Sequence, residues 1–266
     1  MAAHSPEKVF GPADCLRFFR KDQLKATVIL LYAALALTVW KYIPTHDPDS
    51  VSQFGIPCYT ESIIRGIETL NSGEALPLSL FWTGELKSIA ALFLMGILPI
   101  AIVKWGFREK LSDYGLRLGN RYTIQSILLF KPLMVVFVSF SDPVKYAQVY
   151  PLNPLAAILP KPLFSLHLIV YALCYYFGWE FMFRGFLLKG LAPRYGIAAA
   201  VLIQALAATM LHYGHPFPET LGCLGGSIFW GCLALRTRSI LSGWVQHAAL
   251  GVMLDISITA SLHGLG

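Results

Sequence analysis

The sequence predicts an all-α protein that crosses a membrane about seven or eight times. Of its 266 residues, 56% are apolar and only 14% are charged, whereas a soluble domain carries about 25% charged residues. The mean hydropathy is +0.59. At about 20 residues per crossing, the chain is long enough for seven or eight spans. These values argue against a water-soluble enzyme, and they exclude a disordered or collagen-like chain.

Seven apolar runs give the expected membrane spans. The runs are 26–43, 86–103, 122–140, 163–191, 196–212, 220–235 and 240–262. A polar, mostly acidic stretch follows the first run, a basic segment precedes the third, and a proline-bearing connection precedes the fourth, where proline interrupts helical structure. We expect an N-terminal segment, 1–25, followed by one transmembrane domain, 26–266.

The net charge of 21 − 15 = +6 reflects membrane topology rather than nucleic-acid binding. Basic residues precede the first run and fill the segment 104–121. Arg194, Arg236 and Arg238 lie in later turns that fall on the same side of the membrane when the spans alternate in direction. The positive-inside rule therefore predicts a multi-pass protein with a cytoplasmic N-terminus, and no nucleic-acid partner is expected. The five cysteines are scattered, which argues against a disulfide framework or a zinc knuckle.

Two ionisable residues inside the fourth run form the first candidate site. Glu180 and Arg184 are four residues apart, so they share one helical face. An ionisable side chain within a span costs about 3 kcal/mol, and such groups usually face a cavity or one another. The pair is either a structural ion pair or a carboxylate, held by arginine, that acts as a general base toward water.

A second group follows the fifth run. His212 ends the run, and His215 and Glu219 lie shortly after it. Two histidines and an acid could bind zinc, but Pro216 interrupts the helix on which the two histidines would align. A single histidine at a helix end is also often an interfacial residue.

The last run supplies the third group. His247 is followed by Gly251 and Asp255 at intervals of four residues, along roughly one helical face. Packing alone does not readily explain Asp255 inside a span. With Glu180 and His212, His247 completes one carboxylate and two histidines on three separate apolar segments.

These motifs, in this order, resemble the CAAX-protease and bacteriocin-processing (CPBP) family of intramembrane endopeptidases. The matching elements are Glu-x-x-x-Arg-Gly-Phe-Leu-Leu, a histidine ending the next span, and a histidine after Ser-Ile-Leu-Ser-Gly. The upstream LSDYGLRLG is similar to a segment that such proteins carry before their core. The resemblance covers about 110–256 and places a protease-like core at about 163–256.

The chain departs from the family pattern at three positions. Trp179 replaces the first of two adjacent glutamates, Ala208 replaces a phenylalanine, and Gly251 replaces an amide residue. Either Glu180 or Glu219 must then take over the role of the missing glutamate, or the protein is inactive. An asparagine in place of Gly251 could stabilise an oxyanion, so His247 or Asp255 would have to contribute instead.

The resemblance implies cleavage of membrane-anchored, prenylated or C-terminally tagged proteins or peptides within the lipid membrane. Glu180 would deprotonate a water, His212 would position it, and His247 would stabilise the oxyanion or protonate the leaving amine. Supporting roles would fall to Arg184, Asp255, Glu219 and His215. No metal is assigned; if a divalent metal such as zinc takes part, Glu180, His212 and His247 are the expected ligands.

Two other functions stay open at this point. An inactive family member could serve as a bacteriocin-immunity protein or a peptide-binding scaffold. A small transporter could line its pathway with Glu180, Arg184 and Asp255, although the sequence shows no inverted repeat. If successive spans alternate in direction, Glu180 also lies in the cytoplasmic half of the membrane, whereas His212 lies near the outer end of its span. A shared site would therefore need a broken, short or tilted helix.

Overall fold

The computed structural model describes residues 21–43, 68–69, 72, 74 and 76–262, and over these residues the chain forms helices and no strand. The predicted all-α membrane fold is confirmed. The shorter elements are α4 (Leu78–Gly84), the 3₁₀ turns Leu111–Tyr114 and Ala156–Ile158, and α8 (Pro143–Tyr146). The long helices that match the seven apolar runs are α2 (Lys21–Lys41), the composite helix Leu86–Phe107 that begins with α5 (Leu86–Ala91), α7 (Arg121–Ser139), the composite helix Lys161–Tyr195, α12 (Ile197–Leu211), α13 (Phe217–Thr237) and α14 (Leu241–Leu262).

Five helices among the described residues are long and apolar enough to cross a membrane. They are α2, Leu86–Phe107, α7, Lys161–Tyr195 and α14. The apolar α12 has 15 residues, which gives it a length of about 22 Å. It is therefore shorter than the roughly 30 Å hydrocarbon core of a bilayer.

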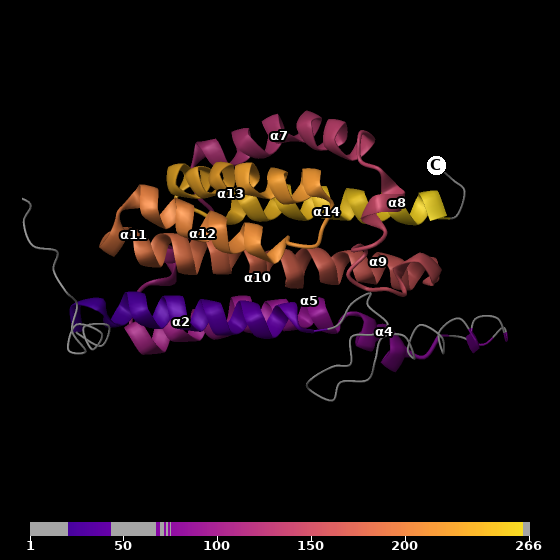
Figure 1. Cartoon of the computed structure of the whole chain (residues 1–266), viewed down its shortest axis with the longest axis horizontal. Coiled ribbons are helices and arrows are strands. Elements are labelled where there is room, and N and C mark those ends of the chain that lie inside the picture. Colours follow the sequence, from indigo (N-terminus) through magenta and orange to yellow (C-terminus); the bar gives the residue numbers. More distant parts are fainter. Residues whose placement is uncertain (1–20, 44–67, 70–71, 73, 75, 263–266) are drawn as a thin grey trace, which may run out of the picture.

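The composite helix Lys161–Tyr195 lies at the centre of the bundle. It contains α9 (Lys161–Val170), α10 (Tyr176–Glu180) and α11 (Gly190–Tyr195), joined by π-helical turns over Tyr171–Tyr175 and Phe181–Lys189. In Figure 1, α2 and α5 lie along one side of it and α12, α13 and α14 along the other, with α7 outermost. A helix that is apolar all round is suited to this buried position, and π-helical turns are frequent at functional sites.

Close packing around the central helix depends on Gly178. A Cβ at this position would lie 2.4 Å from the carbonyl oxygen of Ala91, so only glycine lets α10 cross the composite helix Leu86–Phe107 at this distance. The outer helix α7 is different, because Leu129 and most of its other apolar side chains are exposed. An exposed apolar face is expected for a helix that contacts lipid.

The turn at Gly196 brings Glu180 and His212 to the same depth. Gly196 has a φ of 82° and joins α11 to α12, a backbone conformation that favours glycine. Because Glu180 and His212 are equally far from this turn along two antiparallel helices, they lie side by side. The short α12 is what the sequence required for a shared site.

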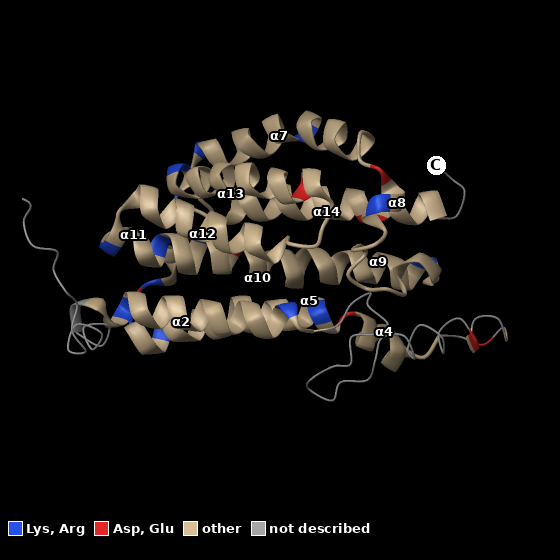
Figure 2. Cartoon of the chain, in the orientation of Figure 1, with Lys and Arg blue, Asp and Glu red and all other residues tan. Residues whose placement is uncertain are grey.

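Basic residues gather at the end of the bundle where α2 and α7 begin and where α11 and α13 end (Figure 2). This distribution is the one from which a cytoplasmic N-terminus is predicted. Most of the expected N-terminal segment 1–25 lies outside the described residues, and its last residues form the first turn of α2.

Candidate active site

The three catalytic candidates converge around one aromatic side chain. Glu180 ends α10, His212 follows the last residue of α12, and His247 lies on α14. The Trp179 ring contacts both histidine rings, with centroid distances of 5.6 Å to His212 and 6.3 Å to His247. The residue that replaces the first glutamate of the family pattern therefore packs between the two histidines.

Glu180 is completely buried and holds His247 in place. Its Oε1 accepts a hydrogen bond from Nδ1 of His247 at 2.9 Å, and its Oε2 lies 3.4 Å from Nε of Arg184. Because a carboxylate only accepts, we assign the proton to Nδ1, which leaves Nε2 of His247 as the second functional nitrogen. A Cβ at Gly243 would lie 2.4 Å from Oε2, so this glycine makes room for the carboxylate.

Arg184 neutralises Glu180 and also borders the cavity beside it. Its guanidinium lies 5.6 Å from the Trp230 ring. None of its three nitrogens has a hydrogen-bond partner among the described residues. Nε faces the Glu180 carboxylate, so the two terminal nitrogens are the donors that remain for a group that enters the cavity.

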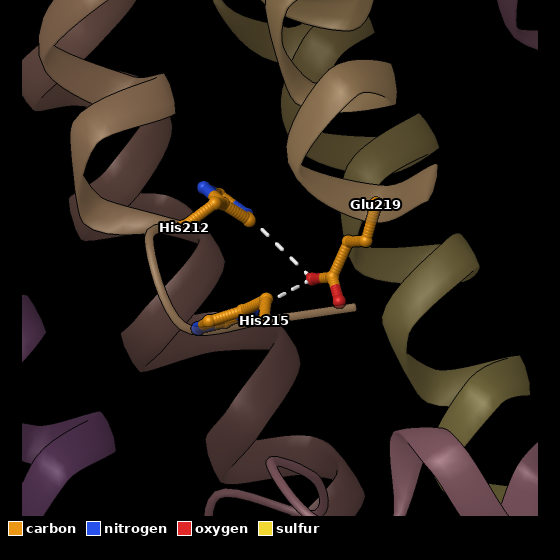
Figure 3. Close-up of side chains that lie close together, drawn as sticks. All are labelled: His212, His215 and Glu219. Atoms are coloured by element: carbon orange, nitrogen blue, oxygen red, sulfur yellow. Dashed lines mark hydrogen bonds and ion pairs between the residues drawn. The ribbon is translucent and has the colours of Figure 1, made fainter. Parts of the chain in front are cut away.

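The second acid of the site is Glu219, on the first turn of α13. Its Oε1 accepts hydrogen bonds from Nδ1 of His215 at 3.0 Å and from the Tyr150 hydroxyl at 2.7 Å, and it lies 3.8 Å from Nε2 of His212. Figure 3 shows both histidine rings directed at this one oxygen. The expected interruption of the helix is present, because α12 ends at Leu211 and α13 begins at Phe217, and the turn between them folds His215 back onto Glu219.

The hydrogen bond at Nδ1 fixes the tautomer of His212. Nδ1 lies 2.9 Å from the carbonyl oxygen of Ala208, which only accepts, so Nδ1 carries the proton and Nε2 presents a lone pair. Nε2 and Oε1 of Glu219 are too far apart for a direct hydrogen bond. Two acceptors facing each other at this distance need a proton donor or a cation between them.

Of the two sets of zinc ligands that the sequence suggested, the structure brings together the one at the end of α12. Among the described residues, His212, His215 and Glu219 bring their ligand atoms within 4.8 Å of one another. This is the donor set that zinc prefers. The other set contains Glu180 and His247, which hydrogen-bond to each other instead.

Tyr176 is a site residue that the sequence gave no signal for. It lies one turn before Glu180, borders the cavity, and packs its ring 4.7 Å from that of His247. A Cβ at Gly251 would lie 1.8 Å from the Tyr176 hydroxyl. The hydroxyl therefore occupies the space left by the missing amide side chain.

Asp255 lies in a separate buried cluster. Its Oδ2 is 3.2 Å from Nε2 of His167, whose Nδ1 is 2.7 Å from Oε1 of Glu85. Asn153 also donates to Glu85 at 2.7 Å. The structure thus pairs Asp255 with His167 on α9 and not with His247, two turns away on its own helix.

These groups open onto an apolar cavity of about 400 Å³ between α7, α13 and α14. His212, Glu219, Arg184 and His247 form one part of its wall, and the remainder is largely aromatic, aliphatic and glycine residues. Such a cavity suits an apolar ligand whose polar portion meets a few fixed groups.

Residues 161–253 match the protein-family model described as type II CAAX prenyl endopeptidase Rce1-like. The matched range contains Glu180, Arg184, His212, Glu219 and His247. The match confirms the predicted resemblance to the CPBP family. No curated protein and no solved structure matches the chain.

Proposed function

We propose that the protein, whose residues 161–253 match the model described as type II CAAX prenyl endopeptidase Rce1-like, is an intramembrane endopeptidase in which Glu219 and His212 activate the attacking water. The observation that carries this assignment is the position of Glu219. It supplies a carboxylate beside His212, at the cavity wall, in a chain where Trp179 has replaced the usual acid.

The hydrogen bonds of Glu219 suit a general base. His215 and Tyr150 fix Oε1, whereas Oε2 is buried and has no partner among the described residues. A water between Glu219 and the lone pair of His212 would lose its proton to the carboxylate as it attacks the substrate carbonyl. This assigns base catalysis to Glu219 rather than to Glu180, which does not reach the cavity wall.

Glu180 then acts through His247. With Nδ1 bound to Glu180, His247 presents Nε2 to the reacting groups and can carry a proton to the leaving amine, while Glu180 stabilises the imidazolium. The Tyr176 hydroxyl and the free donors of Arg184 lie on the same wall and would stabilise the oxyanion. The proton that Glu219 takes from the water passes to Nε2 of His247, and His247 gives it to the leaving amine as the tetrahedral intermediate collapses and the peptide C–N bond breaks. Glu219 is then ionised and His247 neutral again, as at the start.

The substrates that fit this arrangement are membrane-anchored proteins or peptides, including prenylated ones. The apolar cavity would take the lipid-facing part of the substrate, and the peptide bond would meet the polar wall. Membrane lipid is the surrounding partner.

The test is cleavage of a panel of fluorogenic membrane-anchored peptides, prenylated and unprenylated, by purified protein. We expect Glu219→Gln and His212→Ala to lower kcat by about 100-fold or more, with melting temperatures close to that of the wild type. Glu74→Gln, which changes an exposed acid away from the site, is the matched control. Full activity in Glu219→Gln would return the base role to Glu180, and absence of cleavage with retained peptide binding would indicate an inactive scaffold.

A further inference from the structure

A second cavity, of about 580 Å³, meets the active site from the side opposite the apolar one. The two cavities share Tyr150, Trp179 and His212 in their walls. The rest of the second cavity is formed by the end of α2, the start of α5, and the segments 148–152 and 211–215. Its lining includes two lysines, Lys41 and Lys87, whereas the apolar cavity has none.

Lys87 is a buried basic residue in the wall of this cavity. Its side chain is 6% exposed, and its Nζ lies 4.7 Å from the centre of the Trp40 ring. The Trp40 indole is fixed there by a hydrogen bond to the carbonyl oxygen of Lys87 at 3.0 Å. Among the described residues no carboxylate pairs with this ammonium group and no acceptor hydrogen-bonds to it. An ammonium group buried in this way costs several kcal/mol unless a negative charge accompanies it.

Lys41 adds a second ammonium group to the same cavity. It ends α2, and its Nζ donates to the carbonyl oxygens of Leu211 at 2.8 Å and Tyr213 at 3.4 Å. An ammonium group has three donors, and two of them are used within the described part of the chain, so the third can bind a ligand. Because Leu211 and Tyr213 flank His212, the interaction also ties this basic group to the catalytic histidine.

We propose that Lys41 and Lys87 bind the C-terminal carboxylate of the substrate. The inference rests on the proposed function, because it takes the shared wall at His212 as the place of cleavage. The substrate would lie with its anchored portion in the apolar cavity and with the few residues beyond the cleaved bond in the cavity of Lys41 and Lys87. Lys41 and Lys87 would thereby be the residues that distinguish a free carboxylate from a neutral chain end.

The experiment compares peptides of identical sequence that end in a free carboxylate or in an amide. A charge-assisted hydrogen bond contributes about 1.5–3 kcal/mol, so we expect the acid to be preferred about 10- to 100-fold in kcat/KM, chiefly through KM. Lys87→Met should bring the two peptides to within about 3-fold of each other, Lys87→Arg should keep part of the preference, and Lys41→Met should reduce it. Lys145→Met, which removes an exposed lysine elsewhere, is the matched control.

A binding measurement separates this inference from the proposed function. The quenching of tryptophan fluorescence by the short C-terminal product, as acid or as amide, reports occupancy of the cavity, since Trp40 and Trp179 line it. Stronger binding of the acid to wild type and equal binding to Lys87→Met support the carboxylate site even in a protein that cleaves nothing. Equal binding of acid and amide to wild type overturns it, whether or not cleavage occurs. A different result would assign the lysines to lipid phosphate. In that case, Lys87→Met would lose binding to vesicles that contain anionic phospholipid but would keep the preference for the acid peptide.

Discussion

At the residue scale, the contact between Tyr176 and Gly251 decides, in the proposed mechanism, which donor faces the substrate carbonyl. Gly251 lies one turn after His247, and the Tyr176 hydroxyl fills the space above it. The hydroxyl donates to Tyr171 at 3.0 Å, and because a hydroxyl hydrogen rotates freely it can turn to an oxyanion. A tyrosine on one helix can thus supply the donor that a side chain at Gly251 would otherwise provide.

Tyr176→Phe tests this role. The ring remains and only the donor is lost, so we expect kcat to fall by about 10- to 100-fold with KM nearly unchanged, the signature of an interaction made in the transition state. Single-turnover kinetics on a cleaved peptide are the appropriate measurement. Tyr171→Phe, which removes the partner hydroxyl but not the donor, should have a smaller effect. An unchanged kcat in Tyr176→Phe would leave Arg184 as the oxyanion donor.

The hydrogen-bond roles around Glu219 also predict the effect of metal removal. Nδ1 of His215 donates to Oε1 of Glu219, so this nitrogen carries a hydrogen and is not free to bind a metal in this arrangement. His215 could bind a metal through Nδ1 only after its hydrogen moves to Nε2, and the hydrogen-bonded arrangement therefore favours a metal-free site. We expect cleavage to survive dialysis against a strong chelator, and purified protein to contain much less than one zinc per chain by mass spectrometry. One zinc per chain, lost in His215→Ala together with activity, would show instead that His212, His215 and Glu219 form a metal centre.

Asp255 should matter for stability rather than for catalysis. Asp255 and Glu85 flank the buried ring of His167, and loss of one member of a buried ionic group costs about 3–5 kcal/mol. We expect Asp255→Ala to lower the melting temperature clearly, whereas kcat per folded molecule should stay near that of wild type. Thermal unfolding and active-site titration together measure both quantities. A normal melting temperature with lost activity would place Asp255 in the catalytic machinery.

At the element scale, the positions of the helices could be predicted from the sequence better than the way in which the helices pack against one another. Apolar runs are sufficient to predict membrane helices, so each of the seven has a counterpart. The depth of a residue in the membrane also depends on the length of its helix. Glu180 lies on a helix of 35 residues, whereas the neighbouring α12, which ends just before His212, has 15 residues. Ionisable residues within apolar runs identified the site, because burying them is costly. The partners of Asp255 and the approach of Tyr176 to Gly251 depend on how separate helices pack, which one sequence does not specify.

Two glycines of α13 leave open space in the apolar cavity. Gly222 and Gly225 border the apolar cavity, and a Cβ at either would meet no heavy atom within 4 Å. Glycine is also a poor helix former, by about 1 kcal/mol relative to alanine. The two glycines therefore lower the stability of α13. The space that their missing side chains leave is available to a ligand.

Gly225→Leu should separate stability from function. The leucine would occupy cavity volume without a clash, so we expect an unchanged or slightly higher melting temperature and a KM raised about 10-fold or more for the anchored peptide. Gly106→Leu, at an exposed helical position away from the cavity, is the matched control and should leave KM unchanged. An unchanged KM in Gly225→Leu would exclude this cavity as the substrate site.

At the scale of the whole molecule, the active site is placed asymmetrically between the two ends of the bundle. The basic end includes the start of α2 and the end of α11, whereas Lys41 and the second cavity lie at the other end of α2. α2 has 21 residues, a length of about 31 Å that matches a bilayer core. The second cavity therefore opens near the membrane face opposite the basic residues.

Membrane orientation then determines which side supplies the substrate. The positive-inside rule places the basic end in the cytoplasm, so we expect the second cavity to open on the opposite face. In a cysteine-free background, Gln148→Cys at the second cavity should react with a membrane-impermeant maleimide on intact cells, whereas Arg194→Cys at the basic end should react only after permeabilisation. The reverse labelling would put the N-terminus outside and open the cavity to the cytoplasm, and the free C-termini that it accepts would then be those of cytoplasmic proteins. Lys41 and Lys87 line the second cavity in both orientations, so the preference for a free carboxylate should be the same in both. Only the compartment that supplies the substrate would differ.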